Sequence, residues 1–231
     1  MPIYAISNQK GGVGKTTTAV NLASGLARRE HRTLLNDLDP QACASYALLG
    51  PQEPGPTVYY LLIGKQSIEQ VVLSSYQDGL DVLPADIDLA GAEVDLLLAI
   101  GGQTRLRAAL TEKLQPYDYI IIDTPPSLGL LTINALAAAD QVIIPVSGSL
   151  FAIKGVAQLQ ETIQRVRSSQ NHVTALTEYA WGQGQTVGGL PLLSGSVTGE
   201  CPRTWRFLLP MLRRSGALEA CVSQSGKPLA I

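Results

Sequence analysis

Several residue types are scarce in this chain of 231 residues, and each scarcity excludes a class of protein. The three cysteines, Cys43, Cys201 and Cys221, are too few and too scattered for a disulfide framework or a CxxC metal site. Charged residues make up only 16% of the chain against 45% hydrophobic residues, which is not the composition of a disordered protein. The formal net charge of −2 excludes a polycation that binds DNA or anionic lipid through bulk charge.

Long apolar runs are also missing. No stretch reaches the roughly 18 residues of a membrane span, and the first residues, MPIYAISNQK, do not have the pattern of a signal peptide. We therefore expect a cytoplasmic protein built around one large domain, since a typical domain has about 150 residues.

Short apolar segments alternate with helical patterns over the first 170 residues. We expect strands at 3–7, 33–38, 80–84, 119–123 and 141–146, and helices at 16–29, 88–100, 105–114, 130–139 and 152–168. The strands are continuously apolar, which is typical of a parallel sheet covered on both faces. The predicted fold class is therefore α/β, with a doubly wound and mostly parallel sheet.

Residues 171–231 differ in composition from the rest of the chain. They contain no Asp, no Ile before Ile231, both tryptophans and eight of the 22 glycines. We predict no strand or helix between Asn171 and Glu200. We therefore divide the chain into a body, 1–170, and an atypical C-terminal segment, 171–231. This segment is a divergent subdomain, the product of a shifted reading frame or a truncated remnant, and it completes the same domain if it folds.

A glycine-rich segment, QKGGVGKTT (9–17), lies between the first predicted strand and the first predicted helix. Glycines allow consecutive backbone N–H groups to point at phosphate oxygens, and the helix N-terminus adds partial positive charge. This pattern predicts a phosphate-binding loop of a P-loop NTPase, in which Lys15 reaches the β- and γ-phosphates and the Thr16 hydroxyl binds Mg²⁺. The predicted nucleotide-binding residues are Lys10, Gly11, Gly12, Val13, Gly14, Lys15, Thr16 and Thr17.

The string KGGVGKTT resembles the deviant Walker A motif of the ParA/MinD class of P-loop ATPases. In that class a second lysine near the start of the loop, which matches Lys10, reaches the phosphates held by the other subunit of a dimer. The resemblance implies ATP and Mg²⁺ as cofactors and catalytic roles for Lys10 and Lys15, because cations near the γ-phosphate stabilise the charge that develops during transfer.

Two further segments extend the resemblance. NDLDPQ (36–41) resembles the second motif of the class, which implies that Asp37 lies near the metal and that Asp39 positions the attacking water. Because the two aspartates are two residues apart, one strand would point both carboxylates the same way. YIIIDTPPS (119–127) resembles a Walker B strand, and its Asp123 would hold Mg²⁺. The candidate metal residues are thus Thr16, Asp37 and Asp123, and the candidate catalytic residues are Lys10, Lys15 and Asp39.

Asn36 departs from the second motif, because that position is normally apolar and buried in the class. A buried asparagine needs hydrogen-bond partners or it lowers stability. We therefore expect the strand that ends in Asp37 to be locally weakened.

The strings DPQ and DTPPS favour the ParA/Soj branch, which partitions chromosomes or plasmids. The resemblance implies an ATPase that dimerises on Mg-ATP, binds nucleoid DNA non-specifically, makes no membrane contact and hydrolyses ATP when a ParB-type protein stimulates it. Two alternatives stay open: a non-catalytic nucleotide-binding remnant, and a MinD-like regulator at the membrane, against which the lack of a terminal amphipathic helix argues. The candidate DNA contacts, from their positive charge, are Arg203, Arg206, Arg213 and Arg214.

Overall fold

The computed structural model describes residues 1–181 except 52, 54, 114–116, 148–149 and 171–174. The four arginines proposed to contact DNA lie outside the described residues. None of the described helices combines the length and the apolar composition that a membrane span requires.

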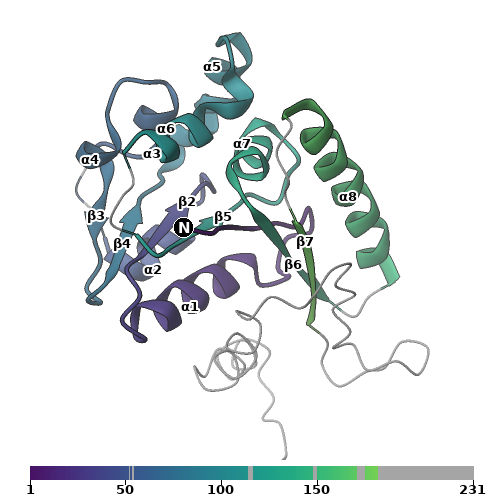
Figure 1. The fold of residues 1–231 in the computed structure, drawn as a ribbon, viewed down its shortest axis with the longest axis horizontal. Coiled ribbons are helices and arrows are strands. Elements are labelled where there is room, and N and C mark those ends of the chain that lie inside the picture. Colours follow the sequence, from purple (N-terminus) through teal and green to yellow (C-terminus); the bar gives the residue numbers. More distant parts are fainter. Residues whose placement is uncertain (52, 54, 114–116, 148–149, 171–174, 182–231) are drawn as a thin grey trace, which may run out of the picture.

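A seven-stranded sheet forms the centre of the fold, with the strand order β3-β4-β2-β5-β1-β6-β7 (Figure 1). Every neighbouring pair is parallel except β3 and β4. The predicted α/β class with a mostly parallel sheet is therefore confirmed. The strands are β1 (Ile3–Ile6), β2 (Thr33–Asp37), β3 (Leu73–Ser74), β4 (Leu80–Leu83), β5 (Tyr119–Asp123), β6 (Gln141–Ser147) and β7 (Ala175–Trp181).

Helices cover both faces of this sheet, so each strand contributes alternate side chains to two apolar layers. Leu35 and Ile121 pack toward α1 and α2, whereas Leu34 and Ile120 pack toward α3 to α7. A third cluster joins β6 to α7 and α8. The helices are α1 (Lys15–Ala27), α2 (Cys43–Leu49), α3 (Val58–Leu62), α4 (Ile68–Val71), α5 (Ala92–Leu98), α6 (Arg105–Lys113), α7 (Leu130–Ala138) and α8 (Leu150–Gln170), with 3-10 turns η1 (Ile87–Gly91) and η2 (Gly102–Thr104).

Strand β7 corrects the expectation that residues 171–200 contain no strand. It pairs in parallel with β6 from Gln141↔Ala175 to Ser147↔Trp181. Within the described residues β7 is an edge strand with one neighbour, and its sequence, ALTEYAW, places Thr177 and Glu178 at its centre. An edge strand does not need the continuous apolar run by which central parallel strands are recognised.

Asn36 is fully buried at the next-to-last position of β2, between Leu83 of β4 and Ile122 of β5. Neither its amide oxygen nor its amide nitrogen has a hydrogen-bond partner among the described residues. It shares a strand face with Leu34, which packs in the apolar layer under α3 to α7. A polar group buried without a partner costs about 1–3 kcal/mol, so this position opposes folding.

We expect Asn36→Val to raise the free energy of unfolding by about 1–2 kcal/mol, because valine is apolar and fits a strand. Urea denaturation followed by circular dichroism measures the change. The matched control is Thr33→Val in the same strand, where the hydroxyl donates a hydrogen bond to the His31 carbonyl (3.0 Å). Thr33→Val should lower the free energy of unfolding. If Asn36→Val lowers it as well, our description of the Asn36 amide is wrong.

Candidate nucleotide-binding site

Three central strands end side by side where the sequence motifs lie. In the register of the sheet, Ile6 of β1 is opposite Asp123 of β5, and Asp123 is opposite Asp37 of β2. Open α/β sheets bind their ligands beyond the carboxyl ends of such strands. The fold therefore brings the glycine-rich loop, NDLDPQ and DTPPS together at one edge of the sheet.

The glycine-rich loop carries the chain from β1 into α1. Gly12 and Gly14 have φ angles of +72° and +87°, which residues with a side chain rarely adopt. A Cβ at either position would meet no atom within 4 Å, so the backbone conformation and not a lack of space requires glycine. Helix α1 begins at Lys15 directly after Gly14, and the first N–H groups of a helix are available to an anion.

Asn8 anchors the start of this loop, and the sequence analysis did not single it out. Its side chain is buried, its Nδ2 donates to the Pro145 carbonyl of β6 (2.7 Å), and its Oδ1 accepts the Lys10 N–H (3.0 Å). The only sequence signal that could have predicted this role is the position of Asn8, a polar residue between a buried strand and the glycine-rich loop. Asn8 thus fixes the loop against the neighbouring strand.

Lys15 is the buried cation of the site. Its Nζ donates to the Lys10 carbonyl across the loop (3.2 Å), and only 7% of the residue is exposed. Burial lowers the pKa of this ammonium, whereas the carboxylates of Asp123 and Asp39 raise it. Lys10 itself is exposed.

Asp123 is fully buried at the end of β5, and neither of its carboxylate oxygens has a hydrogen-bond partner among the described residues. Burial and the neighbouring Asp37 raise its pKa to about 8. The Thr16 hydroxyl lies close enough to oppose this rise, although it does not form a hydrogen bond of standard geometry with the carboxylate. Two unpaired, buried carboxylate oxygens beside a threonine hydroxyl suit a hard divalent cation such as Mg²⁺.

Asp37 is held by the protein itself. Its Oδ2 accepts hydrogen bonds from the backbone N–H and the hydroxyl of Ser45 at 2.8 Å each, and its Oδ1 accepts the Asp39 N–H (3.1 Å). Burial raises its pKa to about 6, against the effect of these hydrogen bonds. Ser45, which also accepts the Ala85 N–H (2.9 Å), is a positioning residue that the sequence analysis missed.

Asp39 does not belong to the strand that carries Asp37, so the expectation of two carboxylates on one strand is wrong. Strand β2 ends at Asp37, and Asp39 lies half-buried in the turn before α2, where its Oδ1 accepts the Gln41 N–H (3.0 Å). The proline that follows Asp39 favours a turn at this point. Asp39 nevertheless lies close enough to Lys15 to raise the pKa of that ammonium.

The described residues hold no group of three or more His, Cys, Asp or Glu side chains arranged as a metal site. A cation beside Asp123 would therefore need ligands from a bound phosphate and from water. Mg²⁺ usually binds in this way, with one or two protein ligands and several waters. The site is thus suited to a metal–nucleotide complex.

Comparison with known protein families agrees with this geometry. A model of the AAA domain family matches residues 1–176. The chain is 48% identical over 170 residues to the sporulation initiation inhibitor protein Soj of Bacillus subtilis. It is 50% identical over 170 residues to the chromosome partitioning protein ParA of Myxococcus xanthus. The chain belongs to the ParA/Soj family of P-loop ATPases.

These alignments cover 73% of this ParA/Soj-type chain, 67% of Soj and 60% of the Myxococcus ParA. Among solved structures, a cobyrinic acid a,c-diamide synthase of Mycobacterium smegmatis, with an ATP analogue and magnesium, is 38% identical with a TM-score of 0.73. The alignment covers 78% of this chain and 74% of the synthase chain. A plasmid partition protein of Borrelia burgdorferi is 26% identical with a TM-score of 0.72, covering 81% and 83%. An ATP complex of a McdA variant from Cyanothece, at 22% identity and a TM-score of 0.78, covers 100% and 98% and shares the fold.

We expect Asp123→Asn to stabilise the protein without nucleotide and Mg²⁺, and to do so increasingly as pH rises. The pKa of this carboxyl is about 8 in the folded protein and about 3.9 in an unfolded chain, so the folded state holds the proton more tightly. Its contribution to stability is therefore lost as pH rises from about 4 to about 8. Asparagine does not ionise, so the gain over wild type should reach a few kcal/mol, as an order of magnitude, at pH about 8.

Urea unfolding at pH about 5 and about 8 measures this difference. The matched control is Asp78→Asn, because Asp78 is exposed and its replacement should change stability little at either pH. If Asp123→Asn and wild type differ in free energy of unfolding by the same amount at both pH values, the account of Asp123 is wrong.

Proposed function

We propose that this protein is a partition ATPase that binds Mg-ATP beyond the ends of β1, β2 and β5 and dimerises on it. It then binds DNA without sequence preference and hydrolyses ATP when a ParB-type protein stimulates it. The observation that carries the proposal is the unpaired, buried carboxylate of Asp123 at the end of β5. It lies beside Thr16 and Lys15, which follow a loop that requires Gly12 and Gly14. The similarity to chromosome partitioning proteins supports the biological role.

Each side chain of the site has one task in this proposal. The N–H groups of Gly11 to Thr17 hold phosphate oxygens, and Lys15 neutralises charge on the β- and γ-phosphates. Thr16 and Asp123 hold Mg²⁺, which supplies positive charge to the phosphates when bound. Asp37, fixed by Ser45, lies beside this pair and holds the Asp39 backbone in place.

Asp39 and Lys10 perform the remaining tasks. The half-buried Asp39 gives its Oδ1 to the Gln41 N–H, and we assign its Oδ2 to the attacking water. The exposed Lys10 reaches the phosphates of a second subunit, which makes dimerisation part of catalysis. ATP that binds the dimer more tightly than the monomer shifts the population toward the dimer.

The remaining proposals concern the DNA contacts, the location of the protein and its domain organisation. We assign DNA contacts to Arg203, Arg206, Arg213 and Arg214, and we place the protein in the cytoplasm on nucleoid DNA. Residues 1–170 act as the ATPase body, and residues 171–231 complete the same domain if they fold. Strand β7 is the described part of this C-terminal segment.

The Mycobacterium smegmatis protein named as a diamide synthase suggests a second candidate, ATP-dependent amide formation. We rank it lower, because its identity of 38% is below the 46–50% of the two ParA proteins. ATP turnover that requires cobyrinic acid and is indifferent to DNA would favour this second candidate.

We expect Lys15→Ala to abolish ATP binding, since it removes the only cation that the structure buries against the loop within the described residues. Calorimetric titration of Mg-ATP measures the affinity. Lys65→Ala, at an exposed lysine outside the site, is the matched control and should bind as wild type does. Unchanged affinity in Lys15→Ala would refute the loop assignment.

We expect Asp39→Ala to retain ATP-dependent dimerisation and to lose turnover by about 100-fold or more, as is typical when a catalytic base is removed. Size-exclusion chromatography with ATP and phosphate release measure the two properties. Turnover at the wild-type rate would refute the role of Asp39. A wild-type chain that stays monomeric and inactive with ATP would instead favour the nucleotide-binding remnant.

A further inference from the structure

Asn8 lies at the point where the backbone of β1 leaves the sheet and enters the glycine-rich loop. The Ser7 N–H still donates to the Ile143 carbonyl of β6 (3.0 Å). Because bonds between parallel strands recur at every second residue, the next donor would be the Gln9 N–H, and its acceptor would be the Pro145 carbonyl. The Asn8 side chain takes this place, since its Nδ2 donates to the Pro145 carbonyl (2.7 Å). The backbone can therefore turn into the loop while the β6 carbonyl stays bonded.

The Asn8 side chain is shielded from water. Only 3% of the residue is exposed. Gly155 of α8 lies beside the amide, because a Cβ on this glycine would be 4.0 Å from the Asn8 Oδ1. When a buried hydrogen bond is broken, its groups are left unpaired away from water, which costs more than at an exposed site. The bonds of Asn8 therefore fix their partners more firmly than bonds on an exposed loop would.

The same amide also fixes the backbone of Lys10. The Asn8 Oδ1 accepts the Lys10 N–H (3.0 Å), two residues further along, which is the bond of an Asx-turn. The Lys10 carbonyl accepts a hydrogen bond from the Lys15 Nζ (3.2 Å). Both backbone groups of Lys10 are thus bonded, one to β6 through Asn8 and one to the first residue of α1, while its side chain is exposed.

Lys10 needs this support more than Lys15 does. The two residues after it are Gly11 and Gly12, and glycine restricts the backbone least. The Lys10 ammonium also lies at the end of a flexible four-carbon side chain, so a small rotation of the backbone displaces it widely. A displacement of about 1 Å can lower a reaction rate by about 100-fold. Lys15, in contrast, is itself buried.

We propose that Asn8 is the positioning residue of Lys10. It fixes the Lys10 backbone to β6 and thereby directs the Lys10 ammonium to the phosphates held by a second subunit. This inference rests on the proposed function, in which Lys10 acts on that second site. It gives Asn8 no contact with ATP, so the loss of Asn8 should lower turnover and leave the affinity for ATP unchanged.

Two variants separate the hydrogen bonds of Asn8. Asn8→Ala removes both, whereas Asn8→Ser keeps an oxygen that can accept the Lys10 N–H, as serine does more weakly in the same kind of turn. The matched control is Asn134→Ser. Asn134 is also fully buried, and its amide donates to the Gly102 carbonyl (2.8 Å) and accepts the Leu106 N–H (3.1 Å), outside the glycine-rich loop.

Turnover at saturating ATP is measured with the full chain, at protein concentrations where turnover per chain no longer rises, and calorimetry measures the affinity for ATP. We expect Asn8→Ala to lower turnover about tenfold or more while its affinity stays within about twofold of wild type. Asn8→Ser should have intermediate turnover. Asn134→Ser should lose stability and keep the turnover of wild type.

Three results of these measurements would overturn the proposal. The first is wild-type turnover in Asn8→Ala. The second is a loss of ATP affinity in Asn8→Ala as large as its loss of turnover, which would make Asn8 a support of the whole loop. The third is an equal loss of turnover in Asn134→Ser, which would make the effect one of stability.

A double-mutant cycle with Lys10→Ala tests whether Asn8 acts through Lys10. Adding Asn8→Ala to Lys10→Ala should lower turnover by less than about twofold further, because the positioned ammonium is already absent. If the two losses multiply, Asn8 acts elsewhere, and the positioning is wrong while the proposed function stands. Wild-type turnover in Lys10→Ala would instead refute the role of Lys10 in the proposed function, and the positioning with it.

Amide hydrogen exchange followed by NMR tests the bond to Lys10 without any catalysis. The Lys10 N–H should exchange about tenfold or more faster in Asn8→Ala than in wild type, because its buried acceptor is lost. Asn8→Ser should give an intermediate rate. Equal rates in wild type and Asn8→Ala would overturn the proposal even for a chain that binds ATP without hydrolysing it.

Discussion

The structure depends on the burial of two carboxylates at the same level of two adjacent parallel strands. Asp37 and Asp123 are neighbours in register, and both are fully buried. Ser45 and the Asp39 backbone satisfy the carboxylate of Asp37, whereas the carboxylate of Asp123 has no hydrogen-bond partner among the described residues. Lys15 is the buried cation of the site, and its own burial lowers its pKa. Such an arrangement is unfavourable until a further cation neutralises it, which is why the site implies a metal-bound ligand.

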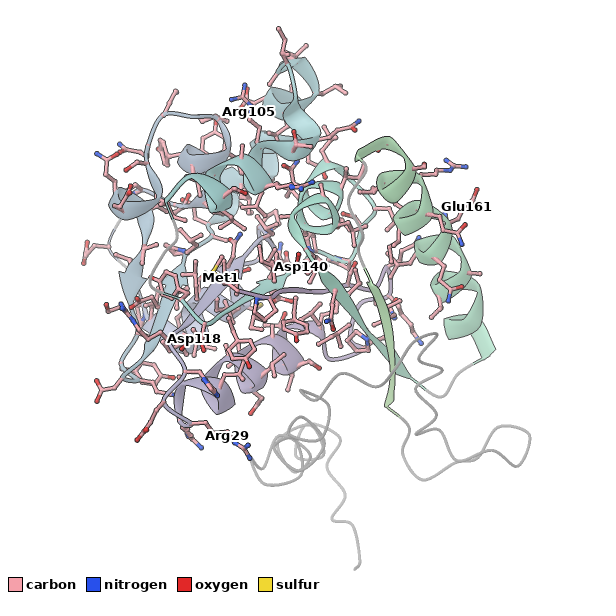
Figure 2. All side chains as sticks on the ribbon, in the orientation of Figure 1. Met1, Arg29, Arg105, Asp118, Asp140 and Glu161 are labelled. Atoms are coloured by element: carbon pink, nitrogen blue, oxygen red, sulfur yellow. The ribbon has the colours of Figure 1, made fainter. Side chains whose placement is uncertain are left out.

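This electrostatic constraint explains how the surrounding residues are arranged. Gly12 and Gly14 allow the loop to fold over Lys15, and Asn8 fixes the loop to β6. The sheet supplies the rigid frame, since its central strands are apolar and packed on both faces (Figure 2). The candidate functional residues therefore lie where the apolar pattern stops, at the last residue of β2 and of β5 and in the loop after β1. Asn36 is the exception, because it places an unpaired amide inside the frame itself.

Much of the site could be predicted from the sequence because each motif follows a strand that is itself recognisable. The resemblance of YIIIDTPPS to a Walker B strand predicted Asp123, and the glycine pattern predicted Lys15 and Thr16. Ser45 and Asn8 could not be found in the same way, since their roles depend on partners at Asp37, Ala85 and Pro145 that only the fold brings near. Strand β7 and the short helices α2, α3 and α4 were missed, because short or edge elements carry too few residues for a period to appear.

The central claim is that the strand-end carboxylates and Lys15 form a binding site for a metal–nucleotide complex. Calorimetric titration of the full chain with ATP, in Mg²⁺ and in EDTA, tests it most directly. The account predicts that Mg²⁺ raises the affinity for ATP by about tenfold or more, or about 1.4 kcal/mol. Equal affinity in the two buffers, or no binding in Mg²⁺, would contradict it.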